Sequence, residues 1–246
     1  GGAGIGRALA WTERLPKHTA FTRTQDATAP IPTRLTIVPA DFPLTAVILA
    51  AGRSRRMGAR NKLLLGWEGG RALVQAVVET VLSVGFERVI VVVGYERDLV
   101  GDVVEGYPVE VVVNDRYEEG LSTSVRCGVL ACGEETEGYL FALGDMPMVK
   151  AEVLAALCRA FVETGDPQGI AVPVAGGRRG NPVLFGAGHR KALIALVGDR
   201  GARGLLADRG ECVVEVPVGD DAGLFADADT PEDYERMTGD HNNAEE

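Results

Sequence analysis

A glycine-rich, basic segment at residues 49–62 directly follows the first buried strand that the sequence predicts. Small residues at its start let a ligand approach the main chain closely. The glycines at positions 52 and 58 permit backbone shapes in which successive N–H groups bind an anion. Five cations fall within ten residues here, and residues 46–67 contain no acid. Because arginine and lysine bind phosphate oxygens, the segment is suited to hold a polyphosphate.

Other kinds of loop fit parts of this pattern. A solvated basic loop is common in proteins and would be the simpler interpretation if no buried strand came before it. The pattern GxxxxGK[ST] is absent, which excludes a P-loop, and no GxGxxG opens a helix, which argues against a Rossmann dinucleotide site. The position after a strand favours ligand binding, because ligands of open α/β sheets lie beyond the carboxyl ends of the strands.

Carboxylates occur at two further places that could serve such a ligand. Asp145 follows the apolar run at 139–143, so we expect it at the same edge of the sheet as the glycine-rich segment. Asp227 and Asp229 alternate along an extended segment, which puts them on one side. Mg²⁺ prefers oxygen ligands and needs only one or two protein carboxylates, so these residues are candidates to hold it. The alternatives are a strand-end turn at Asp145 and helix capping by Asp227 and Asp229.

Alternating strands and helices would position these residues. Strands are expected at 45–50, 88–93, 109–113, 139–143, 169–173, 183–185 and 212–216, with a glycine-rich turn at 176–180. Helices are expected at 72–84, 96–104, 151–163, 191–197, 202–208 and 231–237, and another runs to residue 132 from a cap at Ser122 or Thr123. Thr230 is the expected N-cap of the last helix. Strands that are apolar on both faces predict a three-layer, Rossmann-like α/β fold with a mostly parallel central sheet.

Composition and charge restrict the partners. With 246 residues, 46% of them hydrophobic, the chain suits one globular domain, which we place at 44–238, with an N-terminal extension at 1–43 and a tail at 239–246. The net charge of -10 argues against nucleic acid, which needs a surplus of cations. No apolar run approaches the roughly 20 residues that span a bilayer, so no membrane partner is expected. Four cysteines without a CxxC pair indicate a reducing, cytoplasmic setting rather than a zinc site.

The pattern LAAGxSxRMGxxxK at 49–62 resembles that of the MobA/MocA-like nucleotidyltransferases, most of all the molybdenum cofactor cytidylyltransferases, and the resemblance extends over residues 44–237. It implies an enzyme that attaches a nucleotide to a phosphorylated acceptor, with Mg²⁺ as cofactor. The segment GLSTSVR resembles the family's GxSxSL, near the nucleotide base and ribose. Together the two motifs imply that the nucleotide contacts Leu49, Ala50, Ala51, Gly52, Ser54, Arg56, Met57, Gly58, Lys62, Ser122 and Ser124.

The family's metal motifs are matched as well. GDMP resembles GDxP and DADTPED resembles DxDTPED, so the resemblance implies that Asp145 and Asp229 bind the metal, with Asp227 as a weaker candidate. In the hypothesised reaction Arg56 and Lys62 stabilise the leaving pyrophosphate. The expected catalytic set is therefore Arg56, Lys62 and Asp145.

Two segments resemble the acceptor side of the family. GNPV resembles GHPV, although Asn181 stands where histidine is usual, so a role that needs imidazole does not carry over. GDRGAR resembles GDxGAR, although a glycine turn between a loop and a helix accounts for that segment equally well. The two segments imply an acceptor site with Asn181, Pro182 and Arg203.

The expected reaction transfers CMP from CTP to a phosphorylated acceptor such as molybdopterin and releases pyrophosphate. LAAG favours CTP over GTP, because the guanylyl-using branch tends to LAGG. Three alternatives stay open: an NAD(P)H-dependent oxidoreductase on the same fold, a nucleotidyltransferase for a sugar or alcohol phosphate, and a chaperone-like protein that binds the cofactor precursor without turnover. The retained Asp145 and Asp229 argue against the oxidoreductase, because hydride transfer needs no magnesium.

Overall fold

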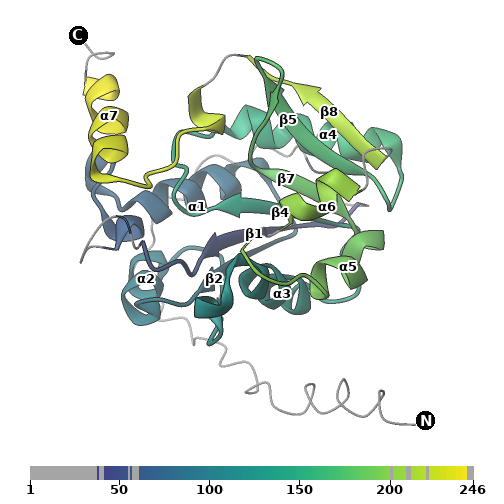
Figure 1. Cartoon of the computed structure of the whole chain (residues 1–246), viewed down its shortest axis with the longest axis horizontal. Coiled ribbons are helices and arrows are strands. Elements are labelled where there is room, and N and C mark those ends of the chain that lie inside the picture. Colours follow the sequence, from purple (N-terminus) through teal and green to yellow (C-terminus); the bar gives the residue numbers. More distant parts are fainter. Residues whose placement is uncertain are drawn as a thin grey trace.

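An eight-stranded mixed sheet forms the centre of the molecule (Figure 1). The computed structural model describes residue 38 and residues 42–54, 56, 61–199, 202–208, 212–219 and 222–242. Seven strands follow the order β3-β2-β1-β4-β7-β5-β6, and β8 pairs with β5. The strands are β1 (Leu44–Ala50), β2 (Arg88–Val93), β3 (Glu110–Val113), β4 (Gly138–Leu143), β5 (Ile170–Ala175), β6 (Arg178–Arg179), β7 (Val183–Gly186) and β8 (Val213–Pro217).

Parallel pairing joins β1 to β2 and β4, β2 to β3, and β5 to β8. Strand β7 is antiparallel to both β4 and β5, and β6 is antiparallel to β5. The sheet is thus parallel around β1 and mixed beyond β4, which confirms the predicted mostly parallel sheet.

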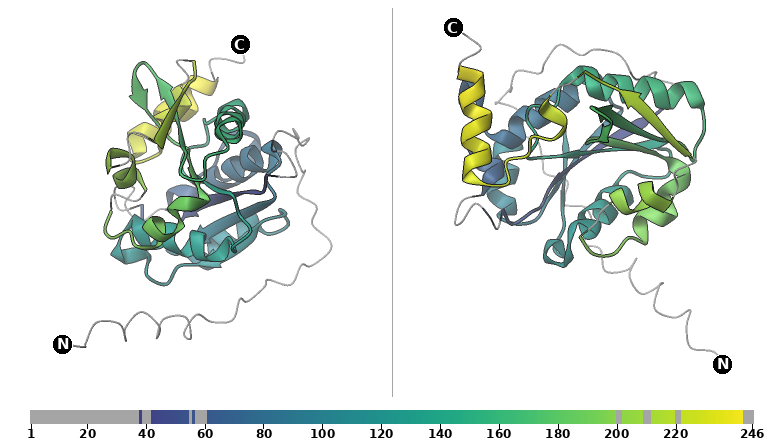
Figure 2. Two further views of the ribbon diagram at one scale, coloured as in Figure 1. Left: turned by 90° about the vertical axis from the view of Figure 1, so that its right-hand side faces the viewer. Right: turned by 45° about the horizontal axis from the view of Figure 1, so that its top comes forward.

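Helices cover both faces of this sheet (Figures 1 and 2). Alternate residues of β1 enter two separate cores. Leu44, Ala46, Ile48 and Ala50 pack with α1 (Leu73–Val84), α2 (Arg97–Val104) and α4 (Ala151–Thr164). Val47, Leu49 and Ala51 pack with α3 (Leu121–Ala131), α5 (Arg190–Ile194) and α6 (Arg203–Asp208). All of β1 is therefore buried, which is why its sequence is continuously apolar, and the predicted three-layer fold is confirmed.

The connections around β1 create the place for a ligand. The chain moves from β1 outward to β2 and β3, and then returns to the other side of β1 to form β4. The carboxyl ends of β1 and β4 thus lie beside each other at a topological switch point, where open α/β sheets bind ligands. The N–H of Gly144, just after β4, donates to the carbonyl of Leu49 at 3.1 Å. This bond joins the glycine-rich segment to the GDMP turn.

Several element boundaries differ from the prediction. Helix α3 begins at Leu121 after Gly120, and no side chain caps it. The Thr123 hydroxyl instead donates to the carbonyls of Arg116 and Gly120, so the prediction that Ser122 or Thr123 caps the helix is wrong. The turn at 176–180 contains the short strand β6, and α5 ends at Ile194. Helix α7 (Pro231–Asn242) continues five residues past its expected end at 237.

The predicted extension and tail fall largely outside the described residues, namely 1–37, 39–41 and 243–246. Two described residues of the extension belong to the core. Val38 is 5% exposed, and the ring of Phe42 packs edge-on against that of Phe161, with 5.8 Å between centroids. Among the described helices, none has the length and apolar character needed to cross a membrane.

Candidate active site

Two carboxylates far apart in the sequence meet at one ammonium group. Nζ of Lys62 contacts Oδ2 of Asp145 and lies 2.7 Å from Oδ1 of Asp229. The side chains of Lys62 and Asp145 are only 13% and 14% exposed, and that of Asp229 is 34% exposed. Nη1 of Arg56 is 2.6 Å from the other oxygen of Asp229. The structure therefore brings together all four residues expected in catalysis and metal binding.

Main-chain contacts explain how Asp229 reaches Asp145. The N–H of Ala228 donates to the carbonyl of Asp145 at 3.3 Å, which attaches the C-terminal segment directly to the GDMP turn. Next in the chain, the Thr230 hydroxyl accepts from the N–H of Asp233 at 3.2 Å, and the carboxylate of Asp233 accepts from the N–H of Thr230 at 3.1 Å. This reciprocal capping starts α7 where the sequence predicts and orients the preceding aspartates.

Lys62 is positioned by its neighbours in the chain. Oδ1 of Asn61 accepts the N–H of Leu63 at 3.1 Å and caps the short 3₁₀ turn Lys62–Leu64. The N–H of Lys62 donates to Oγ of Ser54 at 3.2 Å, which holds the end of the glycine-rich segment against its beginning. The ammonium of Lys62 is consequently held at the carboxylates rather than in solvent.

Burial and charge perturb two groups of the site. Burial, the largest single effect, lowers the pKa of Lys62, but the charges of Asp145 and Asp229 and the hydrogen bonds to them outweigh it and raise the pKa overall. Burial first, and then the negative charges of Asp229 and Asp145, raise the pKa of the Asp227 carboxyl. Asp227 is therefore close enough to add its charge to the site, as its alternation with Asp229 predicts.

The donor set fits a divalent cation. Asp145 and Asp229 present carboxylate oxygens to one cationic atom, so a single ion placed there would touch both. Mg²⁺ is commonly held by one or two carboxylates, with phosphate oxygens and water completing its shell. The residues present can thus hold the metal that the sequence predicts.

The glycine-rich segment opens beside this cluster. Leu49, Ala50 and Ala51 are buried, whereas Gly52 is exposed, and a Cβ built there meets no atom of the described residues within 4 Å. The left-handed backbone conformation belongs to Ser54, with φ of 49°, and not to Gly52. The absence of a side chain at Gly52 therefore leaves open space for a ligand. Met57 and Gly58, also predicted to bind the nucleotide, lie outside the described residues.

Ser122 and Ser124 lie at the start of α3 and are buried, with 2% and 4% exposure. The N–H of Ser122 donates to the carbonyl of Gly198 at 3.1 Å, and Oγ of Ser124 accepts from Nδ2 of Asn114 at 3.0 Å. Sequence reasoning missed Asn114, although a polar residue directly after the strand β3 is a usable signal. The contact of Ser122 and Ser124 with a nucleotide stays a prediction.

The two acceptor segments lie in different places. Nδ2 of Asn181 is 3.8 Å from the sulfur of Met146, next to Asp145, and Pro182 is buried behind a cis peptide bond. The segment with Arg203 instead meets the start of α3, where a Cβ at Gly120 would lie 2.6 Å from Oδ1 of Asp199. Arg203 begins α6, and its side chain lies outside the described set.

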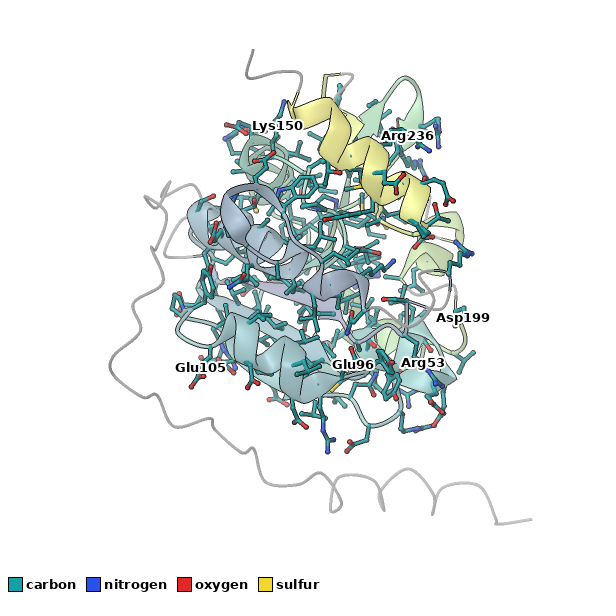
Figure 3. All side chains as sticks on the ribbon, turned by 90° about the vertical axis from the view of Figure 1, so that its left-hand side faces the viewer. Arg53, Glu96, Glu105, Lys150, Asp199 and Arg236 are labelled. Carbon is teal, nitrogen blue, oxygen red and sulfur yellow. The ribbon has the colours of Figure 1, made fainter. Side chains whose placement is uncertain are left out.

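A basic and aromatic group borders the turn at 117–120, which leads into α3. Nη1 of Arg53 is 2.5 Å from the carboxylate of Glu118, and its guanidinium lies 5.7 Å from the centroid of the Tyr95 ring. The rings of Tyr95 and Tyr117 are 6.4 Å apart. Arg53, which pairs with Glu118, and Asp199, which lies next to Gly120, therefore both border the residues that lead into α3; the two are labelled in Figure 3. The sequence did not single out this group.

Comparison with known proteins agrees with this geometry. The family model described as "MobA-like NTP transferase domain" matches residues 46–213. The nicotine blue oxidoreductase of Paenarthrobacter nicotinovorans is 30% identical over 209 residues, which is 80% of this chain and 98% of that protein.

Two solved structures share the fold over nearly their whole length. A nucleotidyl transferase from Methanothermobacter thermautotroptrophicus is 27% identical, with a TM-score of 0.71 over 82% of this chain and 99% of its own. Rv0371c from Mycobacterium tuberculosis H37Rv, in complex with manganese, is 26% identical, with a TM-score of 0.66 over 80% of this chain and 98% of its own.

The family match covers more than half of the chain and includes the glycine-rich segment and the GDMP turn. The predictions of the family, the fold and the enzyme class are thereby confirmed. The chain belongs to the MobA-like NTP transferase family of nucleotidyltransferases.

Proposed function

We propose that this chain transfers CMP from CTP to a phosphorylated acceptor of the molybdopterin type, with Mg²⁺ as cofactor and pyrophosphate as the second product. The observation that carries the proposal is the meeting of Lys62, Asp145 and Asp229 at the end of the glycine-rich segment. The match of residues 46–213 to the family supports it, because that match spans two of the three segments involved.

The chain's own groups account for the chemistry. An acceptor phosphate oxygen attacks the α-phosphorus, and the bond from that phosphorus to the pyrophosphate oxygen breaks. The attacking oxygen is already anionic, so no general base is needed and positioning supplies much of the rate. The main chain around Gly52 binds the triphosphate, while Arg56 and Lys62 neutralise the departing pyrophosphate. Mg²⁺ held by Asp145 and Asp229 would neutralise charge on the phosphate oxygens.

The preference for CTP is argued from Ala51, the third residue of LAAG. Ala51 is 3% exposed, and a Cβ built at Gly94 would lie 2.9 Å from its methyl carbon and 2.7 Å from Cβ of Tyr117, so both side chains face Gly94. We therefore propose that the methyl group influences the base through the position of Tyr117 rather than by direct contact. Glycine there, as in LAGG, leaves room for Tyr117 to move inward.

Substitution of Asp145 tests the proposed function. Asp145→Asn is expected to lower pyrophosphate release from CTP by about a hundredfold or more while the fold is kept, because the metal loses a charged ligand. Asp115→Asn is the matched control: it removes a surface carboxylate that pairs with Arg97 at 2.8 Å. Near-normal release by the Asp145 variant would remove this residue from the mechanism.

One observation favours a second candidate function. The 30% identity to nicotine blue oxidoreductase covers 98% of that protein, so a hydride-transfer activity on the same fold is a specific alternative. A thermal-shift panel of CTP, GTP, ATP, UTP and NADPH, each with and without Mg²⁺, separates the two. Stabilisation by CTP that needs Mg²⁺ supports nucleotidyl transfer. Stabilisation by NADPH alone, followed by NADPH oxidation with an electron acceptor, supports the oxidoreductase.

A further inference from the structure

The carboxylates of the candidate metal site already have cationic partners from the glycine-rich segment. Lys62 contacts both Asp145 and Asp229, and Arg56 lies 2.6 Å from the outer oxygen of Asp229. The described cations near Asp145 and Asp229 are thus the ones assigned to pyrophosphate in the proposed function, on which this inference rests. The carboxylates and the triphosphate therefore compete for the charge of the same cations.

Burial distinguishes the two cations. The side chain of Arg56 is 71% exposed, so water screens its ion pair and the pair is weak. Lys62 is 13% exposed and lies against the equally buried Asp145. A charge in such a place needs a partner, because burial of an unpaired charge is strongly unfavourable. Lys62 is therefore the group that compensates the charge of Asp145.

A divalent ion and this ammonium compete for the same oxygens. Oδ2 of Asp145 and Oδ1 of Asp229 both face Nζ of Lys62, and an ion bound between them would lie against a like charge. The ion binds well only after the ammonium has moved. A triphosphate offers Lys62 new anionic partners and so favours that movement.

We propose that Lys62 is the resident counter-ion of the metal site, and that a bound triphosphate draws it away and so opens the site to the divalent ion. Nucleotide and metal then bind cooperatively, since each stabilises the arrangement that the other requires. Such coupling is reciprocal, and it typically changes the affinity for each ligand by roughly 5–150-fold.

Direct measurement of Mn²⁺ binding tests this inference without any turnover. Free Mn²⁺ is followed by electron paramagnetic resonance in nucleotide-free protein. Lys62→Met is expected to bind Mn²⁺ about tenfold more tightly than the unsubstituted protein, because the competing charge is gone. Arg53→Gln is the matched control: it removes one positive charge from the same segment, but that charge pairs with Glu118, so the affinity stays unchanged.

The outcomes separate the inference from the proposed function. Affinity of Lys62→Met no tighter than that of the unsubstituted protein would overturn the counter-ion role. In the double variant Lys62→Met with Asp145→Asn, Mn²⁺ binding is expected to be lost. If the double variant binds as tightly as Lys62→Met, the metal does not use Asp145, and the proposed metal site itself fails.

A measurement on the unsubstituted protein covers the case in which Lys62→Met does not fold. With lysine labelled at Cε, the Lys62 signal is followed by nuclear magnetic resonance and assigned from its absence in Lys62→Gln. In the presence of EDTA, α,β-methylene CTP is expected to shift this signal, whereas Mg²⁺ alone leaves it in place. If the Lys62 signal does not shift when the nucleotide is added, or if it shifts with Mg²⁺ alone, the inference is contradicted.

Discussion

Single side chains of this protein owe their chemistry to their immediate neighbours, and Tyr107 shows this outside the active site. Tyr107 is 9% exposed, and its hydroxyl donates a hydrogen bond to Oε1 of Glu79 at 2.6 Å. The same carboxylate pairs with Arg71. Burial first, and then the hydrogen bond to Glu79 and its charge, raise the pKa of Tyr107 to about 12. The network joins α1 to the loop that precedes β3.

Tyr107 therefore predicts a pH dependence of stability. A pKa raised above the unfolded value of about 10 means that the neutral phenol stabilises the fold, and this contribution is lost as the pH rises from about 10 to about 12. In an ultraviolet difference titration, Tyr107→Phe is expected to remove a phenol that titrates near pH 12. Tyr234→Phe is the control, because it also removes a hydroxyl that donates a hydrogen bond, here to Gly66. An unchanged absorbance change near pH 12 in Tyr107→Phe would contradict the assignment.

At the scale of elements, close packing of α3 on the sheet positions the start of that helix. Gly128 faces β1 and β2: a Cβ built there would lie 2.4 Å from Cγ1 of Val47 and 3.4 Å from Cγ2 of Val92. Valine in a strand has few rotamers, so the sheet cannot easily yield. The absence of a side chain at Gly128 thus lets α3 lie against the sheet, which sets the position of Ser122 and Ser124 beside Asn114.

A pair of glycine substitutions tests this packing. Gly128→Ala is expected to lower the free energy of unfolding by about 1–3 kcal/mol through overpacking. Gly101→Ala is the matched control in α2, where a Cβ meets nothing within 4 Å in the described part of the chain. It is expected to stabilise the protein by roughly 0.5–1 kcal/mol from helix propensity. Urea unfolding of both variants gives the comparison. Equal effects of the two substitutions would show that α3 is not packed as described.

At the scale of the whole molecule, the C-terminal segment returns to the first helix. A small core joins Trp67, Leu73, Ala76, Ala228 and Met237. Figure 2 shows α7, in yellow, beside the blue elements that include α1. Ala228 is fully buried in this core and lies between the two aspartates of the DADTPED segment. The packing of α7 therefore helps to hold Asp229 at Lys62.

Met237 connects this packing to the active site. Met237→Ala removes a buried side chain of α7, so the helix is expected to open more often while the central sheet keeps its stability. Hydrogen exchange should become faster in α7 alone, and CTP-dependent pyrophosphate release should fall several-fold. Glu235→Ala, at an exposed position of the same helix, is the control. Normal release together with fast exchange in α7 would show that the helix does not position Asp229.

Much of this fold can be predicted because its local patterns have local causes. The apolar runs at β1, β2 and β4 reflect burial on both faces, and the parallel arrangement that follows places Gly52 and Asp145 at one edge. Thr230 marks the start of α7 because its hydroxyl accepts from the N–H of Asp233, only three residues along the chain. The cap of α3 could not be predicted, because the hydroxyls at its start bond to Arg116, Gly120 and Asn114 instead of to the first turn.

The sequence by itself determined most of the order of strands and helices, the basic segment after β1 and the family, because side-chain period, charge and motif spacing are properties of neighbours in the chain. The motifs implied that Asp145 and Asp229 share a metal, but only the tertiary structure decided how Asp229 reaches Asp145 and that Lys62 contacts both. That meeting depends on the hydrogen bond from Ala228 to Asp145 and on the packing of α7 against α1. Contacts between residues distant in the chain are set by how packed elements fit together, which no local pattern records.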